Sequence, residues 1–493
     1  MTRTHPRTWT TLAVAVLALL CALLAQPGSA DAAAGRTYTN PLKAQKGADP
    51  WLEYYNGNYY LVTTSWSSEI TMRKSPTLAG LSTAPGVQVF APANANGCCN
   101  IWAPELHSFN GRWYLYYVAG QGVADYGGTQ RMHVAESAGA DPMGPYTFKN
   151  DLAAPGTDTW LIDGSVLTVG SSLYLLGSAF SGGTQNLVIA PMSNPYTVSG
   201  ALSTISTPTY GWETSGAPVN EGPEPLHHNG KTFIVYSASY CTTPDYKLGQ
   251  LELTGSDPLL ASSWTKKSTP VFQRADAAGV YGPGHNGFFT SPDGTENWIV
   301  YHANNSASGG CDNNRTTRAQ KFTWNADGTP NLGTPVGTGV QLAGPSGETA
   351  ATPTSYTFTN RATGKCLDVE NGSTTDGANV RLWTCNGANA QKWRVEDQGD
   401  DTSRIVNVAS GKVLDVANCS TGDGADLRQW SWLGNGCQRY RLILGAAGGW
   451  VRIANANSGK VADVADCGSA DGTEVRQWTW LNNTCQQWQI TAN

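Results

Sequence analysis

Residues 220–239 read Asn-Glu-Gly-Pro-Glu-Pro-Leu-His-His-Asn-Gly-Lys-Thr-Phe-Ile-Val-Tyr-Ser-Ala-Ser, and this stretch decides the fold. The pair Asn229-Gly230 separates two short runs, of which the second, 232–236, is apolar, β-branched and aromatic. An Asn-Gly pair between such runs is a strong hairpin signal, because a tight hairpin turn needs positive φ at its central residues. The stretch therefore predicts two antiparallel strands, the first of which begins at Glu221.

The same order of an ionisable residue, a turn and an apolar strand occurs five times between residues 49 and 301. The opening residues are Asp49, Glu105, Asp163, Glu221 and His285, at intervals of 56, 58, 58 and 64 positions. A strand unit repeated at such intervals indicates radial repetition, since one small sheet cannot bury both of its faces alone. We therefore expect a five-bladed β-propeller, with the five opening residues around one end of its central channel.

Four carboxylates and one histidine in phase favour a functional site over turn capping. Burial of like charges close together is costly, and folds accept that cost mainly where chemistry needs it. Cleavage of a glycosidic bond needs one carboxylic acid that protonates the leaving oxygen and a second carboxylate across the sugar. The predicted channel mouth offers both groups.

The N-terminal residues 1–34 have the features of a secretory signal peptide. Arg3 and Arg7 precede an uncharged run at 10–24, and small residues follow at 28–30. The run is too short to remain as a membrane-spanning helix. Only 14% of the residues are charged, the formal net charge is −6, and no basic run occurs. We therefore expect a secreted, extracellular monomer that binds neither nucleic acid nor membrane.

A second repeat follows the predicted propeller domain (35–342) and a small-residue linker (343–355), which is expected to be flexible to semi-extended. In residues 356–493 the motif Leu-Asp-Val or Ala-Asp-Val recurs at steps of 47 and 48, and a Trp stands 15 residues after each Asp. The pairs are Asp368 with Trp383, Asp415 with Trp430, and Asp463 with Trp478. Three units, each too small to fold alone, predict a β-trefoil, so the whole chain is predicted to be all-β.

Ten cysteines remain after the signal peptide, an even number that suits disulfides in an oxidising compartment. Six form close pairs in the trefoil: Cys366 with Cys385, Cys419 with Cys437, and Cys467 with Cys485. Each pair closes a loop of about 18–19 residues, worth about 3 kcal/mol in the chain-entropy model. The other four leave two arrangements open: Cys98 and Cys99 bridge each other, or they pair separately with Cys241 and Cys311.

Residues 38–340 resemble glycoside hydrolase family 43, five-bladed-propeller enzymes that cleave arabinose- and xylose-containing plant polysaccharides with inversion. The motifs that carry the resemblance are Ala48-Asp49-Pro50-Trp51, Trp102-Ala103-Pro104-Glu105, Ile162-Asp163-Gly164-Ser165, Glu221-Gly222-Pro223 and Gly282-Pro283-Gly284-His285-Asn286. The resemblance implies that Asp49 is the general base, that Asp163 orients the acid and tunes its pKa, and that Glu221 is the general acid. Glu224 is a nearby competitor that we expect to point away.

The resemblance also implies substrate-binding residues. Trp102 would form a wall of the sugar pocket, and Glu105 would lie with it at the channel mouth. His285 would stand on the propeller axis, close to a structural calcium or sodium ion. Arg318 would lie near the hydroxyls of the buried sugar. The resemblance implies no cofactor for the chemistry itself.

Within the family, residues 40–51 and 281–324 are most similar to exo-acting α-L-arabinofuranosidases that trim α-1,5-linked arabinan. The expected substrates are therefore arabinan or arabino-oligosaccharides of the plant cell wall. Alternatives are a β-xylosidase or an arabinoxylan-debranching α-L-arabinofuranosidase, with exo and endo action both open. A non-catalytic lectin is opposed by the presence of all three carboxylates, and a fructan-acting enzyme by the absence of a Trp-x-Asn-Asp-Pro-Asn-Gly signature.

The C-terminal domain resembles the ricin-B-type lectin trefoil, carbohydrate-binding module family 13. In that family an Asp accepts hydrogen bonds from sugar hydroxyls and an aromatic residue stacks on the ring, which matches the three Asp–Trp pairs. Two departures leave the number of working sites open. Arginine replaces the glutamine found two residues before the Trp in many members, and the usual Asn before Gln-x-Trp is absent. The replacing residues are Arg381, Arg428 and Arg476, and Ala390, Cys437 and Cys485.

Overall fold

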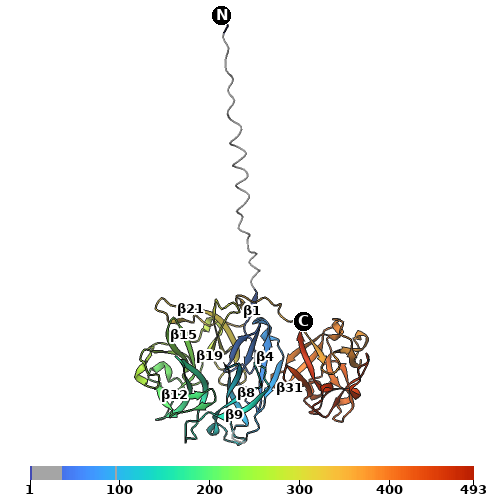
Figure 1. Ribbon diagram of the computed structural model, residues 1–493, viewed down its shortest axis with the longest axis horizontal. Helices are drawn as coiled ribbons and strands as arrows, with labels where there is room; N and C mark the ends of the chain where they lie inside the picture. The colour runs from blue at the N-terminus through green and yellow to red at the C-terminus, as the bar shows by residue number, and fades with distance from the viewer. Residues whose placement is uncertain (3–35, 95–96) are drawn as a thin grey trace.

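The computed structural model describes residues 1–2, 36–94 and 97–493. Residues 3–34 of the predicted signal peptide lie outside the described residues. Figure 1 shows a larger body, coloured blue to yellow, and a smaller C-terminal body, coloured orange to red. The regular elements of the described residues are β-strands and short 3₁₀-helices, which confirms the all-β prediction. None of the described helices is long and apolar enough to cross a membrane.

The larger body is propeller-like: its sheets are antiparallel, and the strands of each follow one another along the chain. Four of these sheets are separate from the rest of the structure. Their strands are β6 (Cys99–Phe109), β7 (Arg112–Gly120), β8 (Arg131–Ser137) and β9 (Tyr146–Asp151); β10 (Ile162–Val169), β11 (Ser172–Ser181), β12 (Thr184–Asn194), β13 (Thr197–Val198) and β14 (Ser203–Ser206); β15 (Asn220–His228), β16 (Lys231–Ala238), β17 (Lys247–Leu253) and β18 (Trp264–Lys266); and β19 (Tyr281–Thr290), β20 (Asn297–Asn304), β21 (Thr316–Trp324) and β22 (Pro330–Asn331).

A further group of four strands precedes them and pairs in the same antiparallel order. These strands are β2 (Trp51–Tyr55), β3 (Asn58–Val62), β4 (Ile70–Ser75) and β5 (Gly86–Phe90). The first strands of all five groups contact one another in the order β2, β6, β10, β15, β19 and back to β2. They therefore surround a common axis. Strand β1 (Thr37–Thr39) pairs with β23 (Gln341–Ala343), which brings the two ends of this body together.

The predicted hairpin at 220–239 is confirmed as the pair β15–β16. Asn229 and Gly230 form its turn, with φ values of 47° and 79°. Val235 and Tyr236 are fully buried in β16, as the apolar run requires. Short 3₁₀-helices lie in the connections of the larger body: η1 (Ala79–Ser82), η2 (Gly127–Thr129), η3 (Gly211–Glu213), η4 (Ala261–Ser263) and η5 (Asp276–Ala278).

The smaller body repeats one unit three times, and each unit contributes four strands. The strands are β24 (Tyr356–Asn360), β25 (Cys366–Val369), β26 (Val380–Trp383) and β27 (Trp393–Asp397); β28 (Ser403–Asn407), β29 (Val413–Val416), β30 (Ala425–Trp430) and β31 (Tyr440–Ala446); and β32 (Trp450–Asn455), β33 (Val461–Val464), β34 (Val475–Trp478) and β35 (Trp488–Ala492). Its 3₁₀-helices are η6 (Glu370–Gly372), η7 (Asn389–Gln391), η8 (Ala417–Cys419), η9 (Gly436–Gln438), η10 (Ala465–Cys467) and η11 (Thr484–Gln486).

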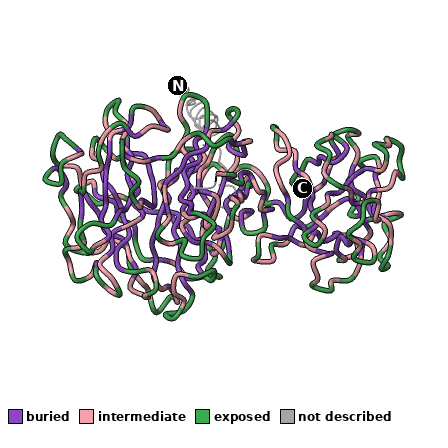
Figure 2. Tube along the Cα trace, turned by 90° about the horizontal axis from the view of Figure 1, so that it is seen from below, coloured by how far each residue is buried: buried purple, intermediate pink, exposed green. Residues whose placement is uncertain are grey.

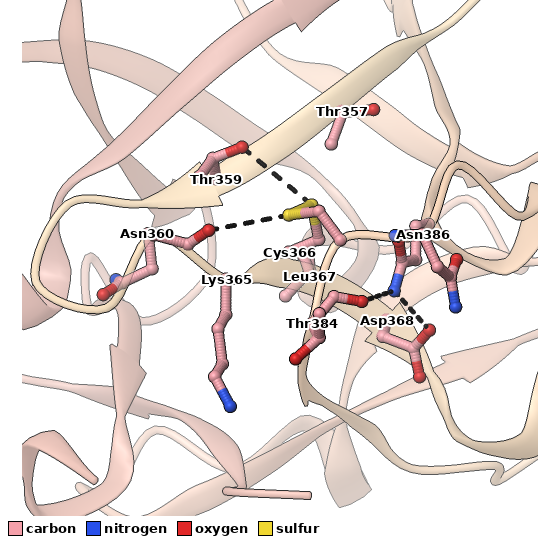
Figure 3. The surroundings of a disulfide bond; sticks show 12 residues. Thr357, Thr359, Asn360, Lys365, Cys366, Leu367, Asp368, Thr384 and Asn386 are labelled. Atoms are coloured by element: carbon pink, nitrogen blue, oxygen red, sulfur yellow. Dashed lines mark hydrogen bonds between the residues drawn. A yellow bond between two sulfur atoms is a disulfide. The ribbon is translucent and has the colours of Figure 1, made fainter. Parts of the chain in front are cut away.

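The three predicted trefoil disulfides are confirmed as Cys366–Cys385, Cys419–Cys437 and Cys467–Cys485. Figure 3 shows the first of them beside Asp368 and Thr384. The remaining four cysteines form the bridges Cys98–Cys99 and Cys241–Cys311. This settles the alternative that the sequence leaves open.

The two bodies share one hydrophobic cluster, which contains Val87 from the larger body and Leu442 from the smaller one. Strand β5 pairs in parallel with β31, where Val87 lies opposite Leu442. The buried Arg73 adds an ion pair with Asp397 at 2.6 Å. Figure 2 shows buried segments in both bodies. The C-terminal body is thus packed against the propeller-like body rather than held only by a chain.

The predicted linker at 343–355 makes hydrogen bonds to the larger body. Arg36 donates hydrogen bonds to the carbonyl oxygens of Glu348 and Thr349. The Glu348 carboxylate accepts from the backbone N–H of Leu78 at 2.8 Å.

Candidate active site

A cleft with a cavity volume of about 740 Å³ lies where the first strands of the larger body begin. It brings together three of the predicted catalytic carboxylates, Asp49, Asp163 and Glu221, with His285. Six aromatic side chains complete its walls: Trp66, Trp102, Tyr126, Trp160, Phe180 and Tyr240. A cleft that combines carboxyl groups, a histidine and apolar ring faces is suited to the cleavage of carbohydrates.

Near the start of each first strand lies a residue with positive φ. These residues are Asp49 (51°), Ala103 (40°), Asp163 (56°), Gly222 (54°) and His285 (43°). In the last four strands this residue lies at a break in register with the neighbouring strand, which marks a bulge. A bulge re-aims a side chain, and such strained positions gather at functional sites.

Of the five predicted opening residues, Asp49, Asp163, Glu221 and His285 line the cleft, and Glu105 does not. Glu105 lies two residues after the bulge residue Ala103, and Glu221 lies one residue before Gly222. Glu105 is buried away from the cleft, where its carboxylate contacts His107 Nε2 at 2.8 Å. The sequence pattern cannot separate these cases, because one residue of shift along a strand turns the side chain to the other face.

Asp49 is held in its ionised form. Thr64 Oγ1 donates a hydrogen bond to Asp49 Oδ2 at 2.6 Å, and Asp49 Oδ1 lies 3.3 Å from His285 Nδ1 and from Arg315 Nη1. Burial raises the pKa of Asp49, but His285, Arg315 and His302 together hold it well below its usual value. Asp49 is thus a carboxylate that stays ionised and can accept a proton.

The surroundings of Glu221 favour its protonated form. Burial raises its pKa, and the hydrogen bonds from Tyr246 and Gln185 only partly oppose that effect. Tyr246 Oη donates to Glu221 Oε1 and Gln185 Nε2 donates to Glu221 Oε2, each at 2.8 Å. The carboxyl group is therefore fixed in place and retains a proton to higher pH than an exposed glutamate.

The surroundings of Asp163, like those of Glu221, favour its protonated form. Burial and the nearby Glu221 and Asp49 raise its pKa to about 8 against the opposing charge of His285. The backbone N–H of Gly222, next to Glu221, donates to Asp163 Oδ2 at 3.0 Å. Asp163 thus contacts the segment that carries Glu221, and the charge of Glu221 raises its pKa.

His285 lies in the cleft, as expected for a residue near the axis. Burial opposes its charge, but Asp49, Asp163 and Glu221 raise its pKa. Its Nδ1 faces Asp49, and the described residues contain no group of three or more His, Cys, Asp or Glu side chains that could hold a metal. The residues around His285 therefore do not fit an ion held directly by several protein ligands, and no step below depends on one.

Arg315, rather than Arg318, is the arginine of the cleft. Arg318 is fully buried and donates to Thr316, Asn305 and backbone carbonyl oxygens outside the cleft, so its predicted contact with the sugar was wrong. Arg315 lines the cleft and contacts Asp49. Side chains three positions apart in an extended segment point to opposite faces, so only one of Arg315 and Arg318 can face the cleft.

Trp102 and Glu224 are two further residues whose places relative to the cleft were predicted from the sequence. Trp102 lines the cleft, and its buried indole N–H has no hydrogen-bond partner among the described residues. Glu224 is 2% exposed and does not line the cleft. Its pKa is raised well above the usual value by burial and by the neighbouring Glu105. Sequence reasoning missed Thr64, Tyr246, Gln185 and His302, which act only through contacts between distant segments.

Each Asp–Trp pair of the trefoil is joined by the arginine that departs from the lectin pattern. The guanidinium carbon lies 4.2–4.3 Å from the centre of the Trp ring in all three units. The same arginine donates through Nε to the Asp carboxylate, at 2.9–3.4 Å. The triplets are Asp368, Arg381 and Trp383; Asp415, Arg428 and Trp430; and Asp463, Arg476 and Trp478. The structure thus brings each predicted pair together and adds a cation to it.

Comparisons with known proteins agree with this geometry. Residues 38–330 match the family model for glycosyl hydrolases family 43. Residues 341–430 and 436–493 match the model for ricin-type beta-trefoil lectin domain-like proteins. The two matches cover the propeller-like body and the trefoil units respectively.

Several individual relatives are named arabinofuranosidases. An extracellular exo-alpha-(1->5)-L-arabinofuranosidase of Streptomyces avermitilis is 42% identical over 343 residues, which cover 67% of this chain and 70% of the relative. Alpha-L-arabinofuranosidase 43 of Humicola insolens is 32% identical over 392 residues, 77% and 74% of the two chains. The crystal structure of an alpha-L-arabinofuranosidase from Lactobacillus brevis is 36% identical, with a TM-score of 0.57, and covers 62% of this chain and 98% of that one.

Proposed function

The chain belongs to glycosyl hydrolase family 43, and from that premise we propose that it is an exo-acting, inverting α-L-arabinofuranosidase. Its substrates are α-1,5-linked arabinan and arabino-oligosaccharides, from which it releases L-arabinose. The relative from Streptomyces avermitilis, which carries that activity in its name, supports the linkage and the exo mode. The ricin-type domain tethers the enzyme to polysaccharide.

The surroundings of Asp49 and Glu221 shift their pKa values in opposite directions, and this contrast within one cleft carries the proposal. Two carboxyl groups in one cleft whose environments push their pKa values apart are the pattern of a base and an acid. The pKa of Asp49 is held well below its usual value, while that of Glu221 is raised. Asp163, the third carboxyl of the cleft, also has a raised pKa and accepts a hydrogen bond from the backbone N–H of Gly222. The family motif at residues 221–223 assigns the role of the acid to Glu221.

The reaction follows from these two states. Asp49 accepts a proton from a water molecule while the oxygen of that water attacks the anomeric carbon. Glu221 donates its proton to the leaving glycosidic oxygen. Attack from the face opposite the leaving group inverts the anomeric configuration. Asp163 keeps a proton close to Glu221, and the charged His285 stabilises the ionised Asp49. The two protons exchange with solvent after product release, which restores the starting state.

The walls of the cleft suit a small, largely apolar-faced sugar. Trp66 lies against Arg315, whose guanidinium carbon is 5.2 Å from the ring centre. Trp160 and Phe180 form a second pair, with ring centres 4.6 Å apart. Sugar C–H faces pack on such rings, and the charged groups between them bind hydroxyls.

We further propose that strands β2–β5 are the first of five blades. Their antiparallel order is that of the four separate sheets. The closed ring of contacts between first strands and the positive φ of Asp49, just before β2, support this assignment. The pairing of β5 with β31 then explains why this blade is continuous with the trefoil sheet.

The tether and the secreted location complete the proposal. A polysaccharide-binding domain raises the local concentration of chain ends, so that weak single sites become useful together. The N-terminal charge and hydrophobicity pattern and the extracellular relative support export. The proposed chemistry requires no cofactor.

Product analysis on three polymers tests the proposal. The purified protein is incubated with linear arabinan, debranched arabinan and arabinoxylan, and the products are separated by chain length. Release of arabinose alone from linear arabinan is the expected result. Mixed oligomers would show endo action, xylose release would show a β-xylosidase, and no release from any pentosan would favour a lectin. Each of these outcomes contradicts the proposal.

A further inference from the structure

The disulfide Cys241–Cys311 lies in the wall of the cleft and joins two loops that are 70 residues apart in sequence. Cys241 belongs to the connection between β16 and β17, and Cys311 to the connection between β20 and β21. The two connections come from neighbouring sheets of the propeller-like body. The bridge is therefore a covalent link across the gap between sheets at the mouth of the cleft.

The first loop ends next to Tyr246, whose hydroxyl donates to the carboxyl group of Glu221. The Tyr246 ring is fully buried and stacks on His302, with ring centres 5.5 Å apart. Its own pKa is raised well above the usual value by burial, so it remains a hydrogen-bond donor. The position of this loop therefore sets the position of one partner of the acid.

The second loop ends at Arg315, which contacts Asp49. Arg315 Nη1 lies 3.3 Å from Asp49 Oδ1, and Arg315 Nη2 donates to the carbonyl oxygen of Cys311 at 3.4 Å. The backbone of Asn313 accepts a hydrogen bond from the N–H of Lys46 at 2.7 Å, which also ties the loop to the segment before Asp49. A bridging residue thus contacts the arginine that holds the base.

No direct hydrogen bond joins the two loops within the described part of the chain. The backbone N–H of Tyr240 donates to Ser215, and the N–H of Gly282 donates to Pro244, both away from the second loop. Loops at the surface move more than the strands that they connect. The disulfide is then the element that keeps their separation constant.

We propose that Cys241–Cys311 is a positioning bridge, which keeps Tyr246 on the acid and Arg315 on the base at the same time. This inference rests on the proposed function, because it assigns a purpose to the geometry of those two groups. The bridge does not touch the reacting atoms and acts only through the two loops. Its effect should therefore be visible in the protonation of both carboxyls.

The proposal predicts a specific change of the pH profile. When Arg315 withdraws, the pKa of Asp49 rises and the acid limb moves to higher pH. When Tyr246 withdraws, the pKa of Glu221 rises and the alkaline limb moves in the same direction. A bridge that only stabilised the fold would lower the amount of active enzyme without moving either limb. The charged and titratable groups that face Asp49 and Glu221, besides one another, are His285, His302, Arg315, Asp163 and Tyr246.

The test compares full-length C241S/C311S with C419S/C437S, which lacks a trefoil bridge far from the cleft. After circular dichroism has shown both to be folded, kcat and KM for a soluble arabinotriose are measured from pH 4 to pH 9. We expect kcat of C241S/C311S to fall about 100-fold, as for a catalytic group displaced by about 1 Å, with both limbs moved to higher pH. C419S/C437S keeps the wild-type profile. Should the serine pair not fold, C241A/C311V replaces it.

A second measurement needs no activity. The pKa of His302 is lowered to about 4 by burial and by Arg315, so loosening of the second loop raises it. The sequence has seven histidines, which makes a ring-proton NMR titration practicable. Unmoved limbs, or an unmoved His302 titration in C241S/C311S, overturn the inference. A wild type that releases no arabinose refutes the proposed function instead, while the NMR titration still decides the role of the bridge.

Discussion

Replacement of Tyr246 by phenylalanine removes one hydroxyl group that donates to Glu221 at 2.8 Å. That bond favours the ionised form of Glu221 and opposes burial, which raises the pKa of this carboxyl. A hydrogen bond to a charged group contributes about 1.5–3 kcal/mol, and about 1.4 kcal/mol corresponds to one pKa unit. Tyr246→Phe should therefore raise the pKa of Glu221 by about 1–2 units.

The rise in the pKa of Glu221 fixes the direction in which the pH profile should move. Glu221 acts as an acid only while it is protonated, so a higher pKa extends activity to higher pH. The alkaline limb of kcat/KM for arabinotriose should move up by about 1–2 pH units, while the acid limb, set by Asp49, stays in place.

A matched control is Tyr236→Phe, which removes a buried bond to Glu213 of the same length, 2.8 Å, from strand β16 and outside the cleft. This variant should lose stability and keep both limbs. An alkaline limb that stays or moves down in Tyr246→Phe would refute the assignment of Glu221 as the acid.

Three further predictions concern other parts of the molecule. Arg315→Gln removes a cation that lowers the pKa of Asp49, so the acid limb of kcat/KM should move up by about one unit; an unmoved limb would mean that the arginine does not act on the base. The pKa of Glu224 is raised in the folded protein, so the free energy of unfolding should fall as pH rises from the pKa of the unfolded chain through that of the folded protein. Glu224→Gln should reduce this fall in calorimetric scans from pH 5 to pH 9; parallel curves for variant and wild type would contradict this. Asp415→Ala should weaken retention on insoluble arabinan by about 10-fold and leave hydrolysis of arabinotriose unchanged; equal retention would show that the middle trefoil unit does not bind sugar.

Much of the architecture was predictable because repetition is visible in the sequence. The Asn229-Gly230 turn, its four counterparts and the three Asp–Trp steps of the trefoil depend on local turn chemistry and fixed spacing. The trefoil disulfides follow the same spacing and are confirmed. The docking of the trefoil on β5 was not predictable, since the parallel pair Val87–Leu442 joins residues that no repeat relates.

The three carboxylates of the cleft were predictable as residues, but not their surroundings. Asp49, Asp163 and Glu221 meet in one cleft as expected. The position of Glu105 was misjudged because the bulge shifts the register by amounts that differ between strands. Arg315 was missed in favour of Arg318 because only the start of β21 decides which of them faces the cleft. Contacts such as Tyr246 to Glu221 depend on loops whose paths leave no periodic pattern.

The most direct test of the central claim is the hydrolysis of two substrates by Glu221→Gln. Arabinotriose has a leaving group that must be protonated, whereas 4-nitrophenyl α-L-arabinofuranoside has one that leaves without a proton. If Glu221 is the acid, the variant loses about 10²–10⁴-fold in kcat on arabinotriose and keeps most of its activity on the aryl substrate. Wild-type rates of arabinose release from arabinotriose by Glu221→Gln would contradict the account.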